Sequence, residues 1–343
     1  MALLFITTNF NILFLFLVNF SVLCGNFIKF GTLSFEENKW AALQRTIKCW
    51  MRNGKWAKDH INNRTSRLYD GTAMNNHNVF QTCNRTNMMS RTGYFWLLSN
   101  NSNCGDTYEE WNLKTFSSIL SGHNIMIVGD SMNELFGVTL CFALNLSSIA
   151  YKVQRQGHDF TLSINRNDWF LLNNENNEET DNKLNVRNYP FYEEVFKKRN
   201  ISILIFNRGA HYKDDVSLIT EINQTLTFLF EKHPSVAVIY RNTAAAHTDV
   251  GNHLFSDPLD EPPSISLPTH YHWDQFKHQN ELVENFLRQN FPSVLRLDVY
   301  SPTVLRNDMH ADALHYCVPG PIDEWVVLLY NSLRLIHFNS YHQ

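Results

Sequence analysis

The residues best suited to chemistry in this sequence are a serine, a histidine and an aspartate that lie far apart along the chain. Ser131 follows Gly129 and Asp130 in the segment IVGDSMNELF, and Asp312 stands three residues before His315 in MHADALHYCVPGPIDEW. A serine hydroxyl is a weak nucleophile at neutral pH and needs a base within hydrogen-bond reach. We predict that His315 is that base, that Asp312 orients it, and that the three form a Ser-His-Asp triad.

Each of the two motifs also has a structural explanation. A Gly-Asp-Ser triplet occurs as a helix cap or by chance, and a D-x-x-H pattern is less specific still. Their places in the chain favour catalysis, because the serine follows a predicted strand and D-x-x-H lies just before the last predicted helix. At the N-terminus of a helix, free backbone N–H groups and the helix dipole would also favour an oxyanion.

Two further segments carry polar residues that suit the same chemistry. In FNRGAH, the amide of Asn207 and the backbone N–H of Gly209 are candidates for an oxyanion hole beside the N–H of Ser131, and capping a turn is the alternative role of Asn207. In YRNTAAAH, Arg241 and His247 could contact substrate or a leaving group, with a structural ion pair as the alternative for Arg241. The predicted oxyanion and substrate-binding residues are therefore Gly129, Asp130, Asn207, Gly209, Arg241 and His247.

The elements that must position these residues alternate between strands and helices. Apolar runs predict buried strands at 124–130, 201–209, 235–243 and 294–300, and the intervening segments predict helices at 133–144, 214–232, 273–290 and 323–336. This alternation is typical of an α/β fold with a parallel sheet and crossover helices. Because ligands of open α/β sheets bind beyond the carboxyl ends of the strands, we expect the polar residues there to meet at one edge.

The rest of the chain is expected to surround this sheet. Residues 26–120 are rich in aromatic and polar residues and predict a loop-rich, cysteine-containing section packed on a catalytic domain at 121–343. Within that domain, 155–198 is expected to be a surface insertion, because it contains the polar run NNENNEETDNKLN.

Composition narrows the class of partner. The chain has 343 residues, of which 44% are hydrophobic, enough for a sizeable core. Its formal net charge of −4 offers no basic field for a polyanion, so nucleic acid is excluded as an expected partner and small neutral or sugar-like ligands are favoured.

The first 25 residues point to the secretory pathway. An apolar run over about 12–23 has the length of a signal-peptide core, although a positively charged start is absent; a cleaved signal peptide and an uncleaved membrane anchor both remain open. Six N-x-S/T triplets beyond residue 25 support a lumenal location, and in an asparagine-rich chain such triplets also arise by chance. The candidate glycosylation sites are Asn63, Asn84, Asn100, Asn145, Asn200 and Asn223.

Six cysteines suit the same compartment. Their spacing includes no CxxC pair and no His/Cys pattern typical of zinc, so no metal is expected. If Cys24 leaves with a signal peptide, five cysteines remain. One of Cys49, Cys83 and Cys104 would then be unpaired, and the sequence leaves open which.

Several segments together resemble one known family. DALHYCVPGPIDEW is similar to the D-C-x-H-W-C-L-P-G-x-P-D-x-W box of the PC-esterase superfamily, an SGNH/GDSL-like group, and most closely to the plant trichome-birefringence-like proteins. GDS, FNRGAHY, YRNTAAAH and LRNDMH resemble further motifs of these proteins in the same order, and CWMRNGKW and YFWLLSNNSNC resemble their cysteine-rich N-terminal section. The resemblance covers about residues 45–335.

The sequence departs from the family pattern at two places. Glu134 and Leu135 stand where the family often has Arg and Asn after the serine box, and Ala313 stands where plant members usually carry a cysteine. The first departure leaves substrate handling open, and the second removes one disulfide partner. We also consider a bond between Cys141 and Cys317, which would pin the nucleophile and base segments together.

The resemblance implies transfer of an acetyl group to hydroxyls of a polysaccharide or glycan in the Golgi lumen, through an acyl-serine intermediate. An acetyl donor, acetyl-CoA or another acyl donor, would be a substrate, and no bound cofactor is expected. Two alternatives stay open: an O-acetyl esterase with the same residues, and a catalytically inactive glycan-binding member, for which Glu134 is the motivating feature.

Overall fold

The three-dimensional structure is a computed structural model of the whole chain. Its described residues are 37–59, 66–68, 93–99, 103–146, 152–155, 158–171, 179–181, 186–188, 193–247, 257–263 and 272–341. The predicted signal or anchor segment at 1–25 lies outside these residues.

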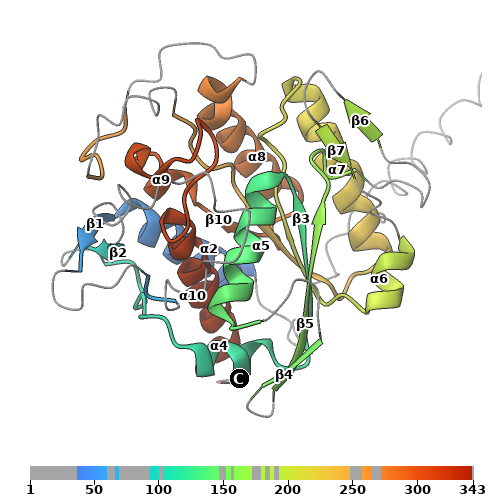
Figure 1. Cartoon of the computed structure of the whole chain (residues 1–343). Helices are drawn as coiled ribbons and strands as arrows, with labels where there is room; N and C mark the ends of the chain where they lie inside the picture. The colour runs from blue at the N-terminus through green and yellow to red at the C-terminus, as the bar shows by residue number, and fades with distance from the viewer. Residues whose placement is uncertain are drawn as a thin grey trace, which may run out of the picture.

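A six-stranded sheet forms the centre of the molecule (Figure 1). Its strand order is β10-β9-β8-β3-β5-β4, and every neighbouring pair is parallel except β4 and β5. The predicted α/β class, with a parallel sheet and flanking helices, is therefore confirmed. The strands are β3 (Asn124–Gly129), β4 (Lys152–Arg155), β5 (His158–Arg166), β8 (Ile203–Phe206), β9 (Ala237–Arg241) and β10 (Leu295–Leu297).

The position of β5 corrects one expectation. We expected 155–198 to be a surface insertion, yet β5 at 158–166 pairs with β3 inside the sheet. Its sequence HDFTLSINR alternates apolar and polar residues, and of the side chains described at 160–166, Phe160, Leu162 and Ser163 are buried and the others are partly exposed. A strand covered only in part lacks the continuous apolar run that marks central parallel strands.

Helices cover both faces of the sheet (Figure 1). Alternate side chains of β3 point to opposite faces: Ile125 and Ile127 pack with one group of helices, and Met126 and Val128 with the other. Each such buried side chain contributes roughly 1.5–3 kcal/mol. The first group is α2 (Glu37–Arg52), α4 (Leu113–Leu120), α5 (Ser131–Ala143) and α10 (Pro321–Tyr341); the second is α6 (Glu193–Arg199), α7 (Asp215–Lys232) and α8 (Phe276–Asn290).

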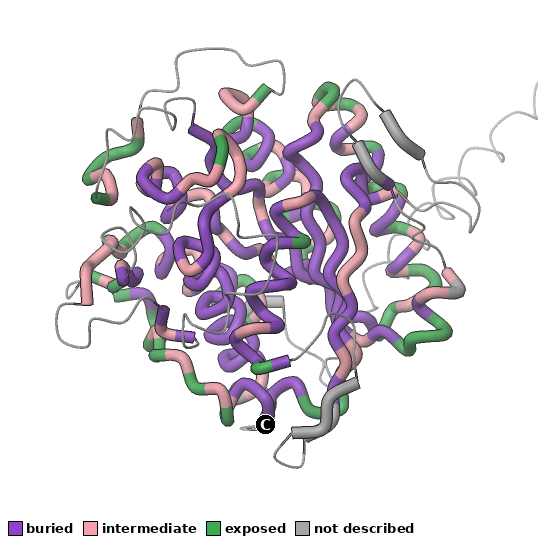
Figure 2. Tube along the Cα trace, in the orientation of Figure 1, coloured by how far each residue is buried: buried purple, intermediate pink, exposed green. Residues whose placement is uncertain are grey.

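The last helix, α10, is buried on almost every side (Figure 2). All residues from Pro321 to Ile336 are buried, and the helix packs against α2, α4 and α5. A helix that is buried on all sides lies in the middle of a large core rather than on a surface. Through these contacts α10 joins the N-terminal section to the helix that begins at the candidate nucleophile.

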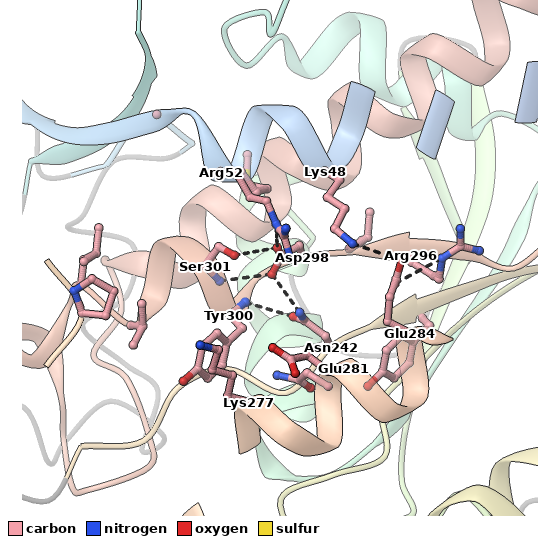
Figure 3. A pocket seen from close by; sticks show the side chains of 18 of the residues that line it. Lys48, Arg52, Asn242, Lys277, Glu281, Glu284, Arg296, Asp298, Tyr300 and Ser301 are labelled. Carbon is pink, nitrogen blue, oxygen red and sulfur yellow. Dashed lines mark hydrogen bonds and ion pairs between the residues drawn. The ribbon is translucent and has the colours of Figure 1, made fainter. Parts of the chain in front are cut away.

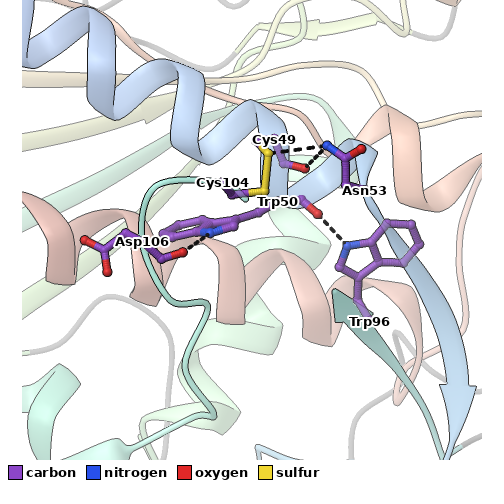
Figure 4. The surroundings of a disulfide bond; sticks show 6 residues. All are labelled: Cys49, Trp50, Asn53, Trp96, Cys104 and Asp106. Atoms are coloured by element: carbon purple, nitrogen blue, oxygen red, sulfur yellow. Dashed lines mark hydrogen bonds between the residues drawn. A yellow bond between two sulfur atoms is a disulfide. The ribbon is translucent and has the colours of Figure 1, made fainter. Parts of the chain in front are cut away.

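The N-terminal section is fixed to the core by a disulfide. Cys49 on α2 is bonded to Cys104, and this pairing answers the question that the sequence left open (Figure 4). The indole Nε1 of Trp50 donates to the carbonyl of Asp106, and that of Trp96 donates to the carbonyl of Trp50. The predicted disulfide-bearing section packed on the core is therefore confirmed.

Short elements complete the described structure. They are β1 (Gly54–Lys58) and β2 (Tyr94–Leu98), which pair antiparallel, β6 (Glu179–Asp181) and β7 (Val186–Asn188), which also pair antiparallel, and α9 (Tyr300–Thr303), η4 (Trp273–Gln275) and η5 (Asn307–Met309). Among the helices of the described ranges, none combines the length and the apolar character that crossing a membrane requires.

Glu324 on α10 is a carboxylic acid buried between this helix and the N-terminal section. Its side chain is 2% exposed. Burial raises its pKa from 4.5 to about 7, although the Arg67 guanidinium and the backbone of Trp96 act in the opposite direction. The folded protein therefore binds this proton more tightly than the unfolded chain does.

We expect Glu324 to make the protein less stable as the pH rises. Below pH 4.5 this carboxyl group is protonated in both the folded and the unfolded chain, so its ionisation costs no stability. Between pH 4.5 and 7 only the unfolded chain gives up the proton, and the free energy of unfolding falls, by about 3 kcal/mol at pH 8. Glu324→Gln should remove this loss in denaturant unfolding at pH 4.5 and pH 8. Glu110→Gln, at an exposed position, should keep the wild-type dependence; an unchanged slope in Glu324→Gln would contradict the assignment.

Candidate active site

Ser131 occupies the first position of α5, directly after β3. Asp130 caps this helix: its carboxylate accepts hydrogen bonds from the backbone N–H groups of Met132, at 2.9 Å, and Asn133, at 3.1 Å. Such a cap contributes about 1 kcal/mol and fixes where the helix begins. The strand-to-helix turn therefore presents the Ser131 side chain beyond the carboxyl end of β3.

Gly129 is required by the geometry of this turn. Its φ angle is +153°, a value that residues other than glycine rarely adopt. A Cβ atom there would lie 2.8 Å from Nδ2 of Asn133 and 3.0 Å from the carbonyl oxygen of Asn207. The residue thus serves the close packing of the turn and of the neighbouring strand end.

The three predicted triad residues lie together. The Oγ atom of Ser131 is 2.7 Å from Nε2 of His315, and Nδ1 of His315 is 2.7 Å from Oδ2 of Asp312. The side chains of His315 and Asp312 are 36% and 59% exposed. With Asp312 on Nδ1–H, Nε2 is the nitrogen that can accept the serine proton, and the open surroundings leave room for a large substrate.

Asp312 is held in its ionised form. Burial alone would raise the pKa of this carboxyl group, but hydrogen bonds from the His315 ring and from the backbone N–H groups of His315 and Leu314 outweigh it and hold the pKa below its usual value. A carboxylate that stays charged at neutral pH can orient the imidazole and stabilise the imidazolium that forms when the serine is deprotonated.

His247 supports the segment that carries the base. Its backbone N–H donates to the carbonyl of Ala313 at 2.9 Å, and its ring nitrogens lie 2.6 Å from Nε2 of His310 and 2.9 Å from the carbonyl of Val304. Burial lowers the pKa of His247. The structure therefore places this predicted substrate-binding residue behind the Asp312–His315 segment, with both ring nitrogens engaged by protein groups.

Arg241 lies beneath the nucleophile turn, at the end of β9. It is fully buried, its Nε donates to Oδ1 of Asn133 at 2.6 Å, and its Nη2 is 3.5 Å from Oδ1 of Asp130. A further hydrogen bond goes to the carbonyl of Asn242, and the guanidinium faces the ring of Trp325. Of the two roles considered from the sequence, the structural ion pair is the one these contacts support.

Asn207 and Gly209 lie at the end of β8, next to β3. The Nδ2 group of Asn207 donates to the carbonyl of Arg241 at 3.0 Å and approaches Oγ1 of Thr243 at 3.3 Å, so both its N–H bonds serve the neighbouring strand end. A Cβ on Gly209 would clash with Thr243. Asn207 thus takes the turn-holding role, and the backbone N–H groups of Ser131 and Gly209 are the oxyanion donors that we retain as a proposal.

The sequence did not reveal a charged group on the other side of Ser131. Arg166, the last residue of β5, pairs bidentately with Asp168 and lies 3.6 Å from Glu134 of α5. Burial lowers the pKa of Arg166, but the hydrogen bonds and the charge of Asp168 outweigh it, so the pKa is raised overall. A polar residue at the end of a strand could have indicated Arg166, as it did for Arg241. Because β5 was not predicted as a strand, its end was not examined for such residues.

The expected bond between Cys141 and Cys317 is wrong. Cys141 is a free, buried thiol on α5, whose pKa is raised to about 12 by burial. Cys317 takes part in a disulfide, and Cys141 is not its partner. Cys141 faces the apolar core under α5 instead, where a thiol behaves as a small apolar side chain.

Three of the six candidate glycosylation sites belong to the described structure. Asn145, Asn200 and Asn223 are all exposed, as attachment of a glycan requires. Asn63, Asn84 and Asn100 lie outside the described residues. Across the described ranges, no group of three or more His, Cys, Asp or Glu side chains is arranged to hold a metal ion.

Comparisons with known proteins return similarities of structure rather than of sequence. No family model matches the chain, and no curated protein matches it. A lipopolysaccharide acetyltransferase periplasmic domain from Salmonella ser. Paratyphi A is 13% identical at a TM-score of 0.39, over 63% of this chain and 85% of that one. A carbohydrate esterase family 3 protein from Talaromyces cellulolyticus is also 13% identical, with a TM-score of 0.37, over 63% of this chain and 97% of that one. A peptidoglycan O-acetylesterase is 8% identical, with a TM-score of 0.38, over 65% of this chain and 95% of that one.

At these identities and TM-scores, the chemistry of this chain is inferred from its own side chains. An α/β sheet that presents a serine, a histidine and an ionised aspartate in hydrogen-bonded sequence defines a site of the serine acyl-transfer or acyl-hydrolysis class.

Proposed function

We propose that this chain is an O-acyltransferase that moves an acetyl group to a hydroxyl of a polysaccharide or glycan, with Ser131 as nucleophile, His315 as base and Asp312 as orienting carboxylate. The observation that carries the proposal is the 2.7 Å contact at each step of the Ser131–His315–Asp312 chain. The motifs that resemble PC-esterase and trichome-birefringence-like proteins, and the exposure of the triad to solvent, support a glycan acceptor.

The chemistry follows from the geometry. Nε2 of His315 takes the proton of the Ser131 hydroxyl while Oγ bonds to the acyl carbon of the donor, and the leaving group departs with that proton. In the second half, His315 takes a proton from the acceptor hydroxyl, whose oxygen bonds to the acyl carbon; as the bond to Oγ breaks, His315 returns that proton to Oγ and the free Ser131 hydroxyl is restored. The backbone N–H groups of Ser131 and Gly209 are proposed to stabilise the oxyanion in both steps.

An O-acetyl esterase is the second candidate, because the same acyl-enzyme is released by water instead of a sugar hydroxyl. The exposed His315 and Asp312 side chains admit water as readily as a sugar hydroxyl, so the esterase is tested beside the transferase. A catalytically inactive glycan-binding role, suggested by Glu134 beside the nucleophile, is less well supported, because Glu134 is ion-paired with Arg166 and the triad contacts are intact.

The secretory pathway is the proposed location, with the Golgi lumen as the compartment. A disulfide within the described structure and three exposed sequons support it, because disulfides persist in oxidising compartments.

The proposal is tested by incubating the purified protein with radiolabelled acetyl donors, with and without xylan-type oligosaccharides, and following label on protein, glycan and free acetate. We expect label on Ser131 and then on glycan. Release as acetate alone, with glycan present, would replace the transferase by the esterase. If no donor labels the protein and a fluorophosphonate leaves Ser131 unmodified, the acyl-enzyme proposal is wrong.

A further inference from the structure

A cavity of about 810 Å³ lies outside the triad, at the β10 edge of the sheet. Side chains of α2 and α8 border it from opposite sides, with Lys48 and Arg52 from the first and Lys277 and Glu284 from the second (Figure 3). We call it the edge groove. Its volume falls within the range of about 300–1,000 Å³ that is usual for small-molecule sites.

The charges that line the edge groove largely cancel. Arg52 lies 3.5 Å from Asp298, Lys48 lies 3.6 Å from Glu284, and Arg296 lies 3.3 Å from Glu284 (Figure 3). Three of the four lining cations are paired in this way, so the groove offers little net field to a polyanion or a polycation. Its lining comprises the cations Lys48, Arg52, Lys277 and Arg296 and the carboxylates Asp260, Asp274, Glu281, Glu284 and Asp298.

Two buried donors in this lining have neither a hydrogen bond nor an ion pair within the described structure, and the buried acceptor Oδ1 of Asp274 has no hydrogen bond either. The hydroxyl of Tyr240 belongs to a side chain that is 1% exposed, and the Nε2 group of Gln44 to one that is 8% exposed. The orientation of the Gln44 amide is set, because its Oε1 accepts the backbone N–H of Arg296 at 3.0 Å. Buried donors of this kind are normally hydrogen-bonded, so each indicates a place for a ligand atom that accepts.

The lining fits a polyhydroxylated molecule. A sugar hydroxyl donates one hydrogen bond and accepts others, so it can meet carboxylates, ammonium groups and amides in turn. Tyr300 and the adjacent prolines Pro262 and Pro263 add apolar surface for the C–H faces of a sugar ring. A neutral oligosaccharide satisfies both kinds of surface without requiring a net charge.

The edge groove is tied to the active site through shared elements. Arg241 at the end of β9 underlies Asp130 and Asn133, and the next residue, Asn242, lines the groove. Val304 also lines the groove, and its carbonyl lies 2.9 Å from Nε2 of His247, which supports the base segment. A chain molecule bound in the groove would therefore lie against the elements that hold the triad.

We propose that the edge groove binds a neutral oligosaccharide, as the non-reacting part of the glycan acceptor. This inference rests on the proposed function for its role in transfer, but the binding itself is measurable without catalysis.

The experiment is isothermal titration of the full-length Ser131→Ala protein with xylohexaose and cellohexaose. Tyr240→Phe, which removes only a hydroxyl without a protein partner, and Lys277→Ala, at an exposed position, should each weaken binding about 2- to 10-fold. Tyr330→Phe is the matched control, because Tyr330 is buried on α10 and does not line the groove. Unfolding midpoints confirm that every variant is folded.

The outcomes separate this inference from the proposed function. Binding that Tyr240→Phe and Lys277→Ala leave unchanged, or no binding of either neutral hexasaccharide, overturns the groove assignment even if acyl transfer through Ser131 is found. Tighter binding of hexagalacturonate than of the neutral sugars overturns the ligand class. Groove-dependent binding without any acyl-enzyme keeps the inference as a saccharide site and contradicts the transferase instead.

Discussion

Ser131→Ala should lower turnover of acetyl donors at least about a thousandfold, because a triad without its nucleophile retains only what substrate binding and the oxyanion site contribute. The acyl-serine intermediate cannot form, so labelled acetyl groups should no longer remain on the protein. The measurement is steady-state release of acetate or transfer to glycan, with mass spectrometry of the protein in parallel.

The fold should survive this substitution, since the cap of α5 is supplied by Asp130 rather than by the serine side chain. Ser118→Ala on α4, at an exposed helical position, is the matched control and should keep full activity. A Ser131→Ala protein that turned over at the wild-type rate would remove Ser131 from the mechanism and leave the geometry of the triad without a function.

Arg241→Met should lower the free energy of unfolding by about 3–5 kcal/mol, because it leaves the buried carboxylate of Asp130 without its cation. Arg241 is 0% exposed and reaches Asn133 as well as Asp130, so its loss also disturbs the residue before Ser131 and one in the first turn of α5. Activity should therefore fall together with stability. Urea unfolding monitored by tryptophan fluorescence gives the first quantity, and acetate release gives the second.

Two controls separate a buried charge from a general effect of losing a cation. Lys197→Met removes a side chain that is 64% exposed and paired with Glu193 at i,i+4, so it should cost no more than about 0.5 kcal/mol. Adding Asp130→Asn to Arg241→Met keeps a helix-capping side chain and removes the unpaired charge, so it should recover part of the lost stability. Equal losses in Arg241→Met and Lys197→Met would refute the buried-pair explanation.

The parts of the site that could be predicted from the sequence are those whose residue types are characteristic of one kind of chemistry. The strand before Ser131 is an unbroken apolar run, and the apolar helix after His315 is equally plain, so two distant motifs could be placed at the end of one sheet. The cap formed by Asp130 follows from local helix chemistry. The turn formed by Asn207 was one of two roles considered, and its side-chain partner on β9 decides between them.

Other parts depended on contacts that a one-dimensional pattern does not contain. Strand β5 was missed because its polar positions interrupt the apolar run, and Arg166, which pairs with Glu134 on the nucleophile helix, was missed with it. The Cys141 assignment failed because spacing along a helix does not say which face of the helix meets a partner. Arg241 and His247 were found as polar residues near strand ends. Only the packing shows that Arg241 contacts the turn that carries Ser131 and that His247 contacts the segment that carries His315.

The separation between nucleophile and base along the chain has a consequence for biosynthesis. Ser131 and His315 are 184 residues apart, and α10, which belongs to the core on one face of the sheet, follows the base. During synthesis from the N-terminus, the core on that face lacks the buried helix α10 until the end of translation. Chemical competence therefore arrives only near the end of translation, with the segment that supplies the base and completes this core.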